Sequence, residues 1–520
     1  MDSGNSADRP GLAKVFCNQK TLGLALTALA LGFAPQAMAR KMPDNSLVQV
    51  LQAAQQAYEA DDCPGTLDLV TPIIESSGFD ALAASARRPF LAMSAVCEAS
   101  AGNTERATSR GRALTELPGA PAEIWNLRFA IDMQLGAYED AVATLEGVQA
   151  RDPSMLVVGR DLFDEQWMFI LNQRLAKQDK DSDVRKRYLA LISREDFAPA
   201  RTQLGYDWMR YAHAAILARA GDAEGAKSVL ARLRNAKALR DASLDTDLRA
   251  LIPADFDLRA AVENEISVLK EIEREKPSLL SVTIAIADAQ QMLGEGAKSL
   301  ATLEAARPYG ILEKQFSDRD DQINWWWDSL AQAYTMLGRY DDAQAAYRQA
   351  IAEGEDGVTG RNVSQVLNVT FIQRKFGDNK AVLETLETID IEADDYASPY
   401  GKMTYHLAHG CASWALDHKA AAAKDIAWAE AHEDVSSSSL TQLYLCTGNE
   451  DAAAALLIRR LDDSDDRTKA LVDLSYYQPT PETMPVDPED AVLARVRDRD
   501  DVQAAIERAG GLRHFNIPSL

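Results

Sequence analysis

The strongest constraint on the fold is a pattern of small and aromatic residues spaced around one glycine, Gly338. Before this glycine, apolar residues recur every three or four positions, which places their side chains on one face of an α-helix. Glycine adopts the left-handed conformation at a helix end without steric cost, so Gly338 should end this helix with a positive φ. The spacing then resumes behind two acidic residues, which favour a helix N-terminus. Residues 325–351 are therefore predicted to form a helical hairpin. Its packing positions are Trp327, Leu330, Ala331, Tyr334, Ala343, Tyr347 and Ala350.

The same pattern recurs along the chain. A small or apolar residue stands seven positions before each turn residue, and another stands five positions after it. One hairpin cannot bury its own apolar face, whereas stacked copies bury a continuous core. We therefore predict an all-α fold, an α-solenoid of stacked hairpins. The further turn residues are Gly102, Gly136, Gly221, Gly294, Gly377, Asp417 and Gly448.

The order W-x2-L-A-x2-Y, then G-x-Y, then A-x3-Y-x2-A within residues 327–350 resembles the tetratricopeptide repeat, a helix-turn-helix unit of about 34 residues. The resemblance implies that the first helix of each hairpin lines a concave groove. It also implies that the second helices form the outside of the superhelix.

Several stretches lack a turn glycine. Residues 159–178 and 183–195 predict a helical pair, and residues 255–277 predict one long amphipathic helix. Prolines and acids then break the helical pattern, and a last helix is predicted at about 489–508. The predicted division is a signal peptide over residues 1–39, a repeat solenoid over 40–477, a linker over 478–488, and a C-terminal helix and tail over 489–520.

The N-terminus carries the features of a secretory signal. Lys14 and Lys20 precede an apolar stretch that ends in Ala37-Met38-Ala39, a small-x-small cleavage site. The stretch is too short to favour a membrane span, although a retained anchor stays as the alternative. Because the residues before Lys14 are unusual for a signal, translation is predicted to start near Val15. Together with an alanine- and arginine-rich composition, the signal predicts a bacterial periplasmic or secreted protein whose mature chain begins at Arg40.

Four cysteines remain once the signal with Cys17 is removed, and an even number in an exported protein favours disulfides. Cys63 and Cys97 are 34 residues apart, and Cys411 and Cys446 are 35 apart, about one repeat in each case. Bonds within these two pairs would join adjacent hairpins near the two ends of the array. Four buried free thiols are the alternative.

The formal net charge of −24 argues against general binding of nucleic acid or of anionic membranes, because both need a basic surface. Apolar residues make up 47% of the chain and charged residues 26%, as in a globular protein. The simplest interpretation is that the acids lie on solvated helix faces.

No motif supports a named catalytic residue. The stretches "GDAEGAKS" and "GEGAKS" differ from a phosphate-binding loop and occupy equivalent turns of two repeats. His406 and His409 lie one helical turn apart near Cys411, with His418 and His432 further along. Two histidines on one face hold a metal only if an acid or a thiolate completes the set. Packing or surface histidines are the commoner case, so no metal ligand and no cofactor are assigned.

The tryptophans suggest a binding surface. Trp325 lies about 200° around the helix from Trp327, so it cannot share the packing face. Helical spacing adds Asp328 and Gln332 to its face. The predicted partner-binding residues are Trp208, Tyr211, Trp325, Asp328 and Gln332.

The charge of this groove limits the partners that fit it. Some tetratricopeptide domains clamp a peptide carboxylate with basic and asparagine side chains. Here the corresponding positions include Glu123 and Asn126 near Gly136 and Asp328 near Gly338. The acidic residues Asp328 and Glu123 depart from that pattern. An aromatic and acidic groove suits an extended peptide with basic or apolar residues. The alternative is that Trp208 and Trp325 only cover gaps between repeats.

These observations predict a non-catalytic scaffold or adaptor in the bacterial periplasm that binds an extended peptide or a protein partner. The rival hypothesis is an envelope enzyme or a metal-handling protein that uses the histidine-rich stretch around residues 406–418.

Overall fold

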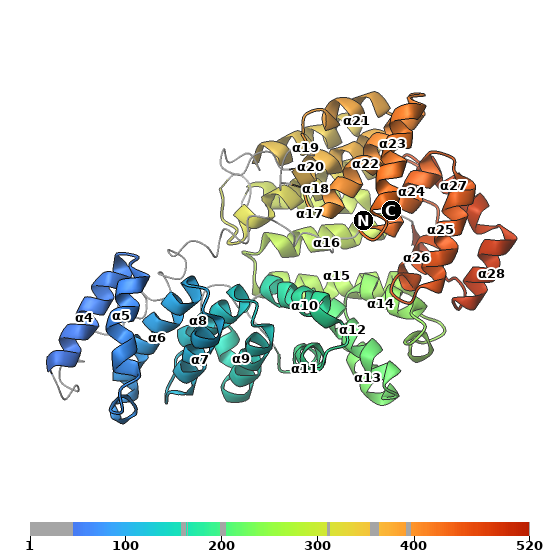
Figure 1. Cartoon of the computed structure of the whole chain (residues 1–520). Helices are drawn as coiled ribbons and strands as arrows, with labels where there is room; N and C mark the ends of the chain where they lie inside the picture. The colour runs from blue at the N-terminus through green and yellow to red at the C-terminus, as the bar shows by residue number, and fades with distance from the viewer. Residues whose placement is uncertain are drawn as a thin grey trace. The chain divides into compact units, whose positions relative to one another are not determined.

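Figure 1 shows the computed structural model of the chain, in which α-helices dominate. The described residues up to His213 form one compact unit, and those from Ala214 onward form another. The structure describes residues 45–157, 163, 165–197, 204–308, 313–353, 363–391 and 397–518.

The N-terminal unit is a series of helical hairpins. Within it α4 packs on α5, α6 on α7, α8 on α9 and α10 on α11. The boundary with the second unit falls inside α12 (Tyr206–Arg219). The other helices of this unit are α4 (Asn45–Glu59), α5 (Cys63–Ile74), α6 (Ala84–Ser100), α7 (Thr104–Glu116), α8 (Ala122–Gln134), α9 (Tyr138–Arg151), α10 (Glu165–Asp179) and α11 (Asp183–Ile192), with the 3₁₀ turns η1 (Phe79–Ala81) and η2 (Pro153–Val157).

The C-terminal unit continues the hairpin pattern. The pairs α16–α17, α18–α19, α20–α21, α22–α23 and α24–α25 each pack together, and each first helix also contacts the next along the series. The helices are α13 (Ala223–Leu230), α14 (Ala236–Leu244), α15 (Leu258–Glu275), α16 (Leu280–Met292), α17 (Gly296–Ala306), α18 (Arg319–Met336), α19 (Tyr340–Glu353), α20 (Val363–Lys375), α21 (Asn379–Leu386), α22 (Pro399–Ala415), α23 (Lys419–Ala431), α24 (Ser437–Cys446), α25 (Glu450–Asp462), α26 (Arg467–Leu474), α27 (Glu489–Arg497) and α28 (Asp500–Arg508), with the 3₁₀ turn η3 (Arg249–Leu251) and the strands β1 (Tyr476–Gln478) and β2 (His514–Pro518).

The predicted turn residues end the first helices as expected. Gly338 has φ of 70°, and each of the other turn glycines also has a positive φ. Asp417 takes the same conformation at φ of 63° without being glycine, which aspartate tolerates better than most residues. The residues seven before and five after each turn are buried. The hairpin prediction is therefore confirmed, and the chain is built from tetratricopeptide-like hairpins.

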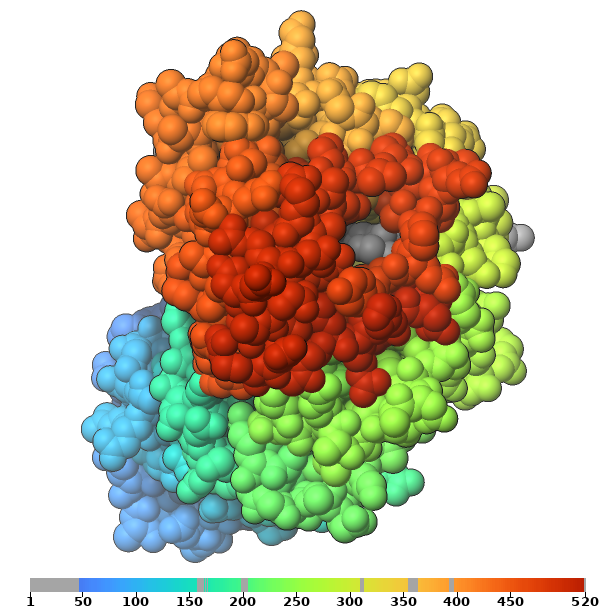
Figure 2. Space-filling model, turned by 90° about the vertical axis from the view of Figure 1, so that its right-hand side faces the viewer, coloured from blue at the N-terminus to red at the C-terminus, as the bar shows by residue number. Residues whose placement is uncertain are grey.

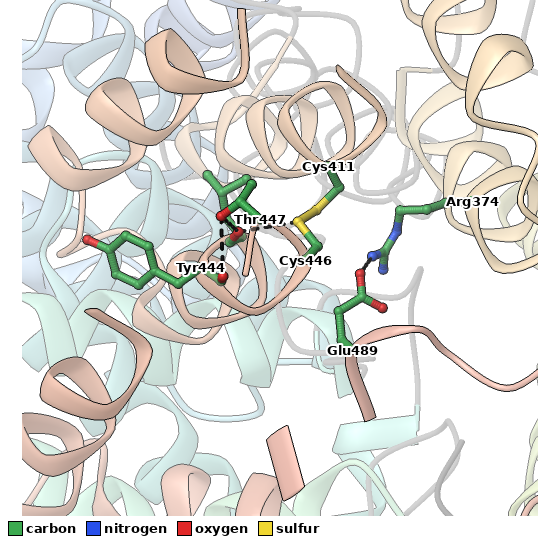
Figure 3. The surroundings of a disulfide bond; sticks show 7 residues. Arg374, Cys411, Tyr444, Cys446, Thr447 and Glu489 are labelled. Atoms are coloured by element: carbon green, nitrogen blue, oxygen red, sulfur yellow. Dashed lines mark hydrogen bonds and ion pairs between the residues drawn. A yellow bond between two sulfur atoms is a disulfide. The ribbon is translucent and has the colours of Figure 1, made fainter. Parts of the chain in front are cut away.

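Both predicted disulfides are present. The Cα atoms of Cys63 and Cys97 lie 5.0 Å apart, and those of Cys411 and Cys446 lie 5.5 Å apart. The first bond joins α5 to α6, and the second joins α22 to α24, so each connects neighbouring hairpins. Figure 3 shows the second bond and its surroundings.

The prediction of one helix over residues 489–508 was wrong. The structure has two helices, α27 and α28, separated at Asp498 and Arg499. Arg499 takes an extended backbone and pairs with Asp501, whose carboxylate accepts the N–H of Val502. Because acids favour a helix N-terminus, this charge pattern begins a new helix where periodicity alone predicted a continuous one.

The C-terminal tail contains a β-strand, which the all-α prediction did not include. Strand β2 pairs in parallel with β1, with Tyr476 opposite His514 and Gln478 opposite Pro518. Gln478 therefore belongs to a strand and not to the linker. Strand β2 contacts α15, and α26 contacts α14. The end of the C-terminal unit thus packs against its own beginning.

The predictions about residues 1–39, including the signal peptide, Cys17 and the cleavage after Ala39, fall outside the described residues. Among the residues that are described, none of the helices is long and apolar enough to cross a membrane.

Candidate functional site

The three consecutive tryptophans of α18 have different environments. Trp326 and Trp327 are buried, and their ring centroids lie 4.7 Å apart in an edge-to-face arrangement. Trp326 Nε1 donates to the Leu303 carbonyl oxygen at 3.2 Å, and Arg307 lies over both rings. The predicted packing role of Trp327 is confirmed. Trp325 is only partly buried and still contacts the same apolar core, so it is not purely a surface residue.

Asp328 and Gln332 come together one turn and two turns after Trp325. The hydroxyl of Tyr347 donates to Asp328 at 2.7 Å, and the Asn368 amide donates to the same oxygen at 2.9 Å. Gln332 Nε2 donates to the Tyr347 hydroxyl oxygen at 3.2 Å. Asp328 therefore connects α18 to the second helix of its own hairpin and to the first helix of the next hairpin, a structural role that sequence periodicity did not predict.

A second set of hydrogen bonds extends this arrangement to the preceding hairpin. Ser329 Oγ donates to Asp288 Oδ1 at 2.5 Å, and Gln291 Nε2 donates to the Ser329 carbonyl oxygen at 2.9 Å. Together with Asp328 and Asn368, these bonds link the first helices α16, α18 and α20. We call Asp288, Asp328, Ser329 and Asn368 the polar row.

The two carboxyl groups of the polar row, Asp288 and Asp328, ionise less readily than free aspartates. Burial raises the pKa of Asp328 to about 6, although the hydrogen bonds from Tyr347 and Asn368 oppose the shift. Asp288 is exposed at the surface, but desolvation by the surrounding chain raises its pKa, against the hydrogen bond from Ser329 and the charge of Lys237. The negative charge of Asp288 further raises the pKa of Asp328. A cation that approached these carboxylates would relieve their mutual repulsion.

The N-terminal unit holds the other predicted aromatic pair. Trp208 and Tyr211 lie on α12, both partly buried, with ring centroids 6.2 Å apart in an edge-to-face contact. On α8, Glu123 is partly buried and Asn126 is buried. The structure thus brings Trp208 and Tyr211 together, while Trp325 belongs to the other compact unit.

The histidines near residue 410 share one buried carboxylate. His406 Nδ1 lies 2.8 Å from Asp425 Oδ1, and His409 Nδ1 lies 2.7 Å from Asp425 Oδ2. Burial opposes ionisation of Asp425, but the hydrogen bonds to the two histidines outweigh it and lower its pKa. The hydrogen bond to Asp425 raises the pKa of His409 against the effect of burial.

This arrangement differs from the metal-binding set that the rival hypothesis requires. The sulfur of Cys411 is in a disulfide, and His432 directs Nδ1 to the Trp428 carbonyl oxygen at 2.8 Å. Among the described residues, the single group of three potential metal ligands within 4.8 Å of one another is Cys411, Cys446 and Glu489, and its two sulfurs are bonded to each other. The histidines instead connect α22 to α23.

The two stretches that resemble phosphate-binding loops are helix turns. Gly221 and Gly294 both have positive φ and both follow helices, not strands. In the first stretch Asp222 caps the next helix by accepting the N–H of Gly225 at 2.9 Å. Their glycines are therefore explained by the hairpins.

Sequence reasoning missed Asp288, Tyr347 and Asn368 as members of the site. A signal was present, because Asp288, Asp328 and Asn368 are spaced 40 residues apart. Such a spacing predicts equivalent positions on successive first helices only when the hairpins have similar lengths.

The described hairpins, stacked in series with positive-φ turns, have the architecture of a tetratricopeptide-like α-solenoid. No protein-family model and no curated protein sequence matches the chain. Among solved structures, yeast Tom70 is similar at a TM-score of 0.30 and 11% identity, covering 90% of this chain and 100% of that one. The APC/C hetero-tetramer Cut9-Hcn1 is similar at a TM-score of 0.27 and 11% identity, covering 92% and 99%. The hairpins themselves, and not these likenesses, establish the repeat architecture.

Proposed function

We propose that this protein is an exported, non-catalytic scaffold or adaptor of the bacterial periplasm. It binds an extended segment of a protein partner along the first helices of its repeats. The observation that carries the proposal is the polar row with Trp325 beside it, because it combines an aromatic ring with acidic groups on consecutive hairpins.

The carboxylates of the polar row favour a partner with basic side chains. Asp288 and Asp328 repel each other in a partly desolvated setting, so a lysine or arginine side chain would pair with carboxylates whose ionisation is otherwise unfavourable. Trp325 keeps part of its ring accessible and suits an apolar or cationic side chain of the same segment. Trp208 and Tyr211 offer a second aromatic surface in the N-terminal unit. The overall charge of −24 also favours a basic partner.

Export is supported by the N-terminal signal pattern and by two disulfides that join neighbouring hairpins. Sequencing of the mature N-terminus tests this part of the proposal. A chain that begins at Arg40 supports cleavage after Ala39, whereas a retained apolar stretch would indicate an anchor.

The experiment for the binding function is a crosslinking pull-down from the native envelope with three forms of the full chain. These are the wild type, Trp325→Ala and the matched control Trp414→Ala, which removes a partly buried ring at the end of α22. We expect one partner to be recovered by the wild type and the control, and to be reduced with Trp325→Ala. Equal recovery with all three forms would contradict a role for Trp325.

A further inference from the structure

The segment between β1 and α27 is a strap, residues 479–488, that crosses the ends of several hairpins. Its sequence, "PTPETMPVDP", contains four prolines and begins and ends with proline. Both of its ends are fixed, because β1 pairs with β2 and α27 packs on α24 and α25.

The first half of the strap contacts the turns that end α16 and α18. Thr483 Oγ1 donates to the Met336 carbonyl oxygen at 2.6 Å. A Cβ atom at Gly338 would lie only 2.7 Å from the Thr483 carbonyl oxygen, so the strap passes directly over this turn. A Cβ atom at Gly294 would lie 3.6 Å from Pro481 Cγ, which is ordinary van der Waals contact. Met484 in this half is buried, with 6% exposure.

The second half is held by charge at the end of α20. Lys375 Nζ lies 3.1 Å from Asp487 Oδ2, and Arg374 forms an ion pair with Glu489 at the start of α27. Burial raises the pKa of Asp490, and the charge of Asp487 raises it further. Three carboxylates therefore face two cations here, while the side chain of Val486 between the two anchored halves is 66% exposed.

The surrounding helices are held independently of the strap. The disulfide joins α22 to α24 directly beside Glu489, whose carboxylate lies within 4.8 Å of both sulfurs. Figure 3 shows Glu489 directed toward Arg374 next to this bond. Loss of the ion pairs can therefore release the strap while the hairpins around it stay connected.

The strap contacts the C-terminal ends of α16, α18 and α20, the same first helices that carry the polar row. In Figure 2 the last part of the chain, in red, lies against the green atoms with which the C-terminal unit begins.

We propose that the strap is a gate on the C-terminal unit, held closed by the ion pairs of Arg374 and Lys375 and opened locally when they are lost. Whether the strap opens does not depend on the proposed function. Only the idea that this opening admits a partner rests on the proposed function. The side chains are 12% and 12% exposed in the Arg374–Glu489 pair and 15% and 35% exposed in the Lys375–Asp487 pair, so salt screens these pairs less than exposed ones.

The test is hydrogen exchange of the full oxidised chain, followed on peptides that cover residues 478–488 and on peptides from α22 to α25. The variant is Lys375→Glu, which places a fourth negative charge against Asp487. The matched control is Lys380→Glu, which reverses the charge of an exposed lysine on the neighbouring helix α21, paired with Glu384 instead of the strap. A third form, Lys375→Glu with Asp487→Lys, restores the pair in reverse.

We expect strap peptides of Lys375→Glu to exchange about three- to tenfold faster at low salt. The charge-swapped form should return toward the wild-type rate, and the peptides from α22 to α25 should not change. Because both ion pairs are mostly shielded from solvent, high salt should reduce the difference between the forms only slightly. Equal strap exchange in Lys375→Glu and Lys380→Glu would overturn the proposal. Parallel loss of protection in α22 to α25 would also overturn it, since the strap would then be part of one cooperative core.

Discussion

Substitution of Gly338 by alanine should loosen the strap as well as strain the turn. An alanine at φ of 70° costs roughly 1–2 kcal/mol because its Cβ crowds the backbone in the left-handed region. The new Cβ would also lie 2.7 Å from the Thr483 carbonyl oxygen, which must move away. Loss of the Thr483 hydrogen bond to Met336 adds about 1 kcal/mol, so we expect a total near 2–3 kcal/mol.

Gly377→Ala is the matched control. Gly377 has φ of 78°, but a Cβ there meets nothing within 4 Å, so only the backbone cost of roughly 1–2 kcal/mol applies. A repeat array need not unfold in two states, so hydrogen exchange by segment is the suitable assay. Both variants should lose protection in their own and adjacent hairpins, and only Gly338→Ala should speed exchange in residues 479–488. Equal strap exchange in the two variants would refute the contact between Gly338 and Thr483. A uniform loss of hydrogen-exchange protection along the whole chain would argue against coupling between neighbouring hairpins only.

Three further predictions follow from the packing and the buried charges. Peptide mapping without reductant should recover Cys63–Cys97 and Cys411–Cys446, and each bond should contribute about 3 kcal/mol; a Cys63–Cys446 link would contradict the connectivity. Trp327→Ala should cost about 3–5 kcal/mol in thermal melts, whereas Trp325→Ala, partly exposed, should cost only about 1–2 kcal/mol; equal losses would show that Trp325 is a packing residue. Burial raises the pKa of Asp132 from 3.8 to about 7, although the charge of Arg128 and the hydrogen bond from Thr144 oppose the shift. The folded state therefore binds the Asp132 proton more tightly than the unfolded state does. The stability that this proton contributes is lost as the pH rises from about 4 to about 7. Asp132→Asn should remove this pH dependence, and parallel stability curves for the two forms would count against the shift.

The hairpins were predictable because their signals are local. Gly338 and Asp417 mark turns through backbone conformation, and the apolar residues around them are spaced within a single hairpin. The spacing of the cysteines matches one repeat, which brings Cys63 near Cys97 once the hairpins stack. The fold and both disulfides follow from these patterns.

The connections across the C-terminal unit were not predictable in this way. The contact between Thr483 and Met336 joins residues 147 positions apart, and Asn516 accepts the N–H of Arg259 across 257 positions. No periodicity encodes such pairs. The role of Asp328 was missed for a different reason. Its partner Asn368 lies 40 residues further on, and this spacing marks equivalent positions only when successive hairpins have similar lengths.

The most direct test of the central claim is a calorimetric titration of the captured partner's bound segment into the full chain. The titration compares the wild type with Trp325→Ala, Asp328→Asn and the control Trp414→Ala. If the segment binds along the polar row, Trp325→Ala should weaken binding by about 1–3 kcal/mol. Asp328→Asn should weaken it most for a segment with lysine or arginine, and less as salt is raised. Unchanged affinity in both variants, with the control also unchanged, would show that the partner binds elsewhere and would contradict the account.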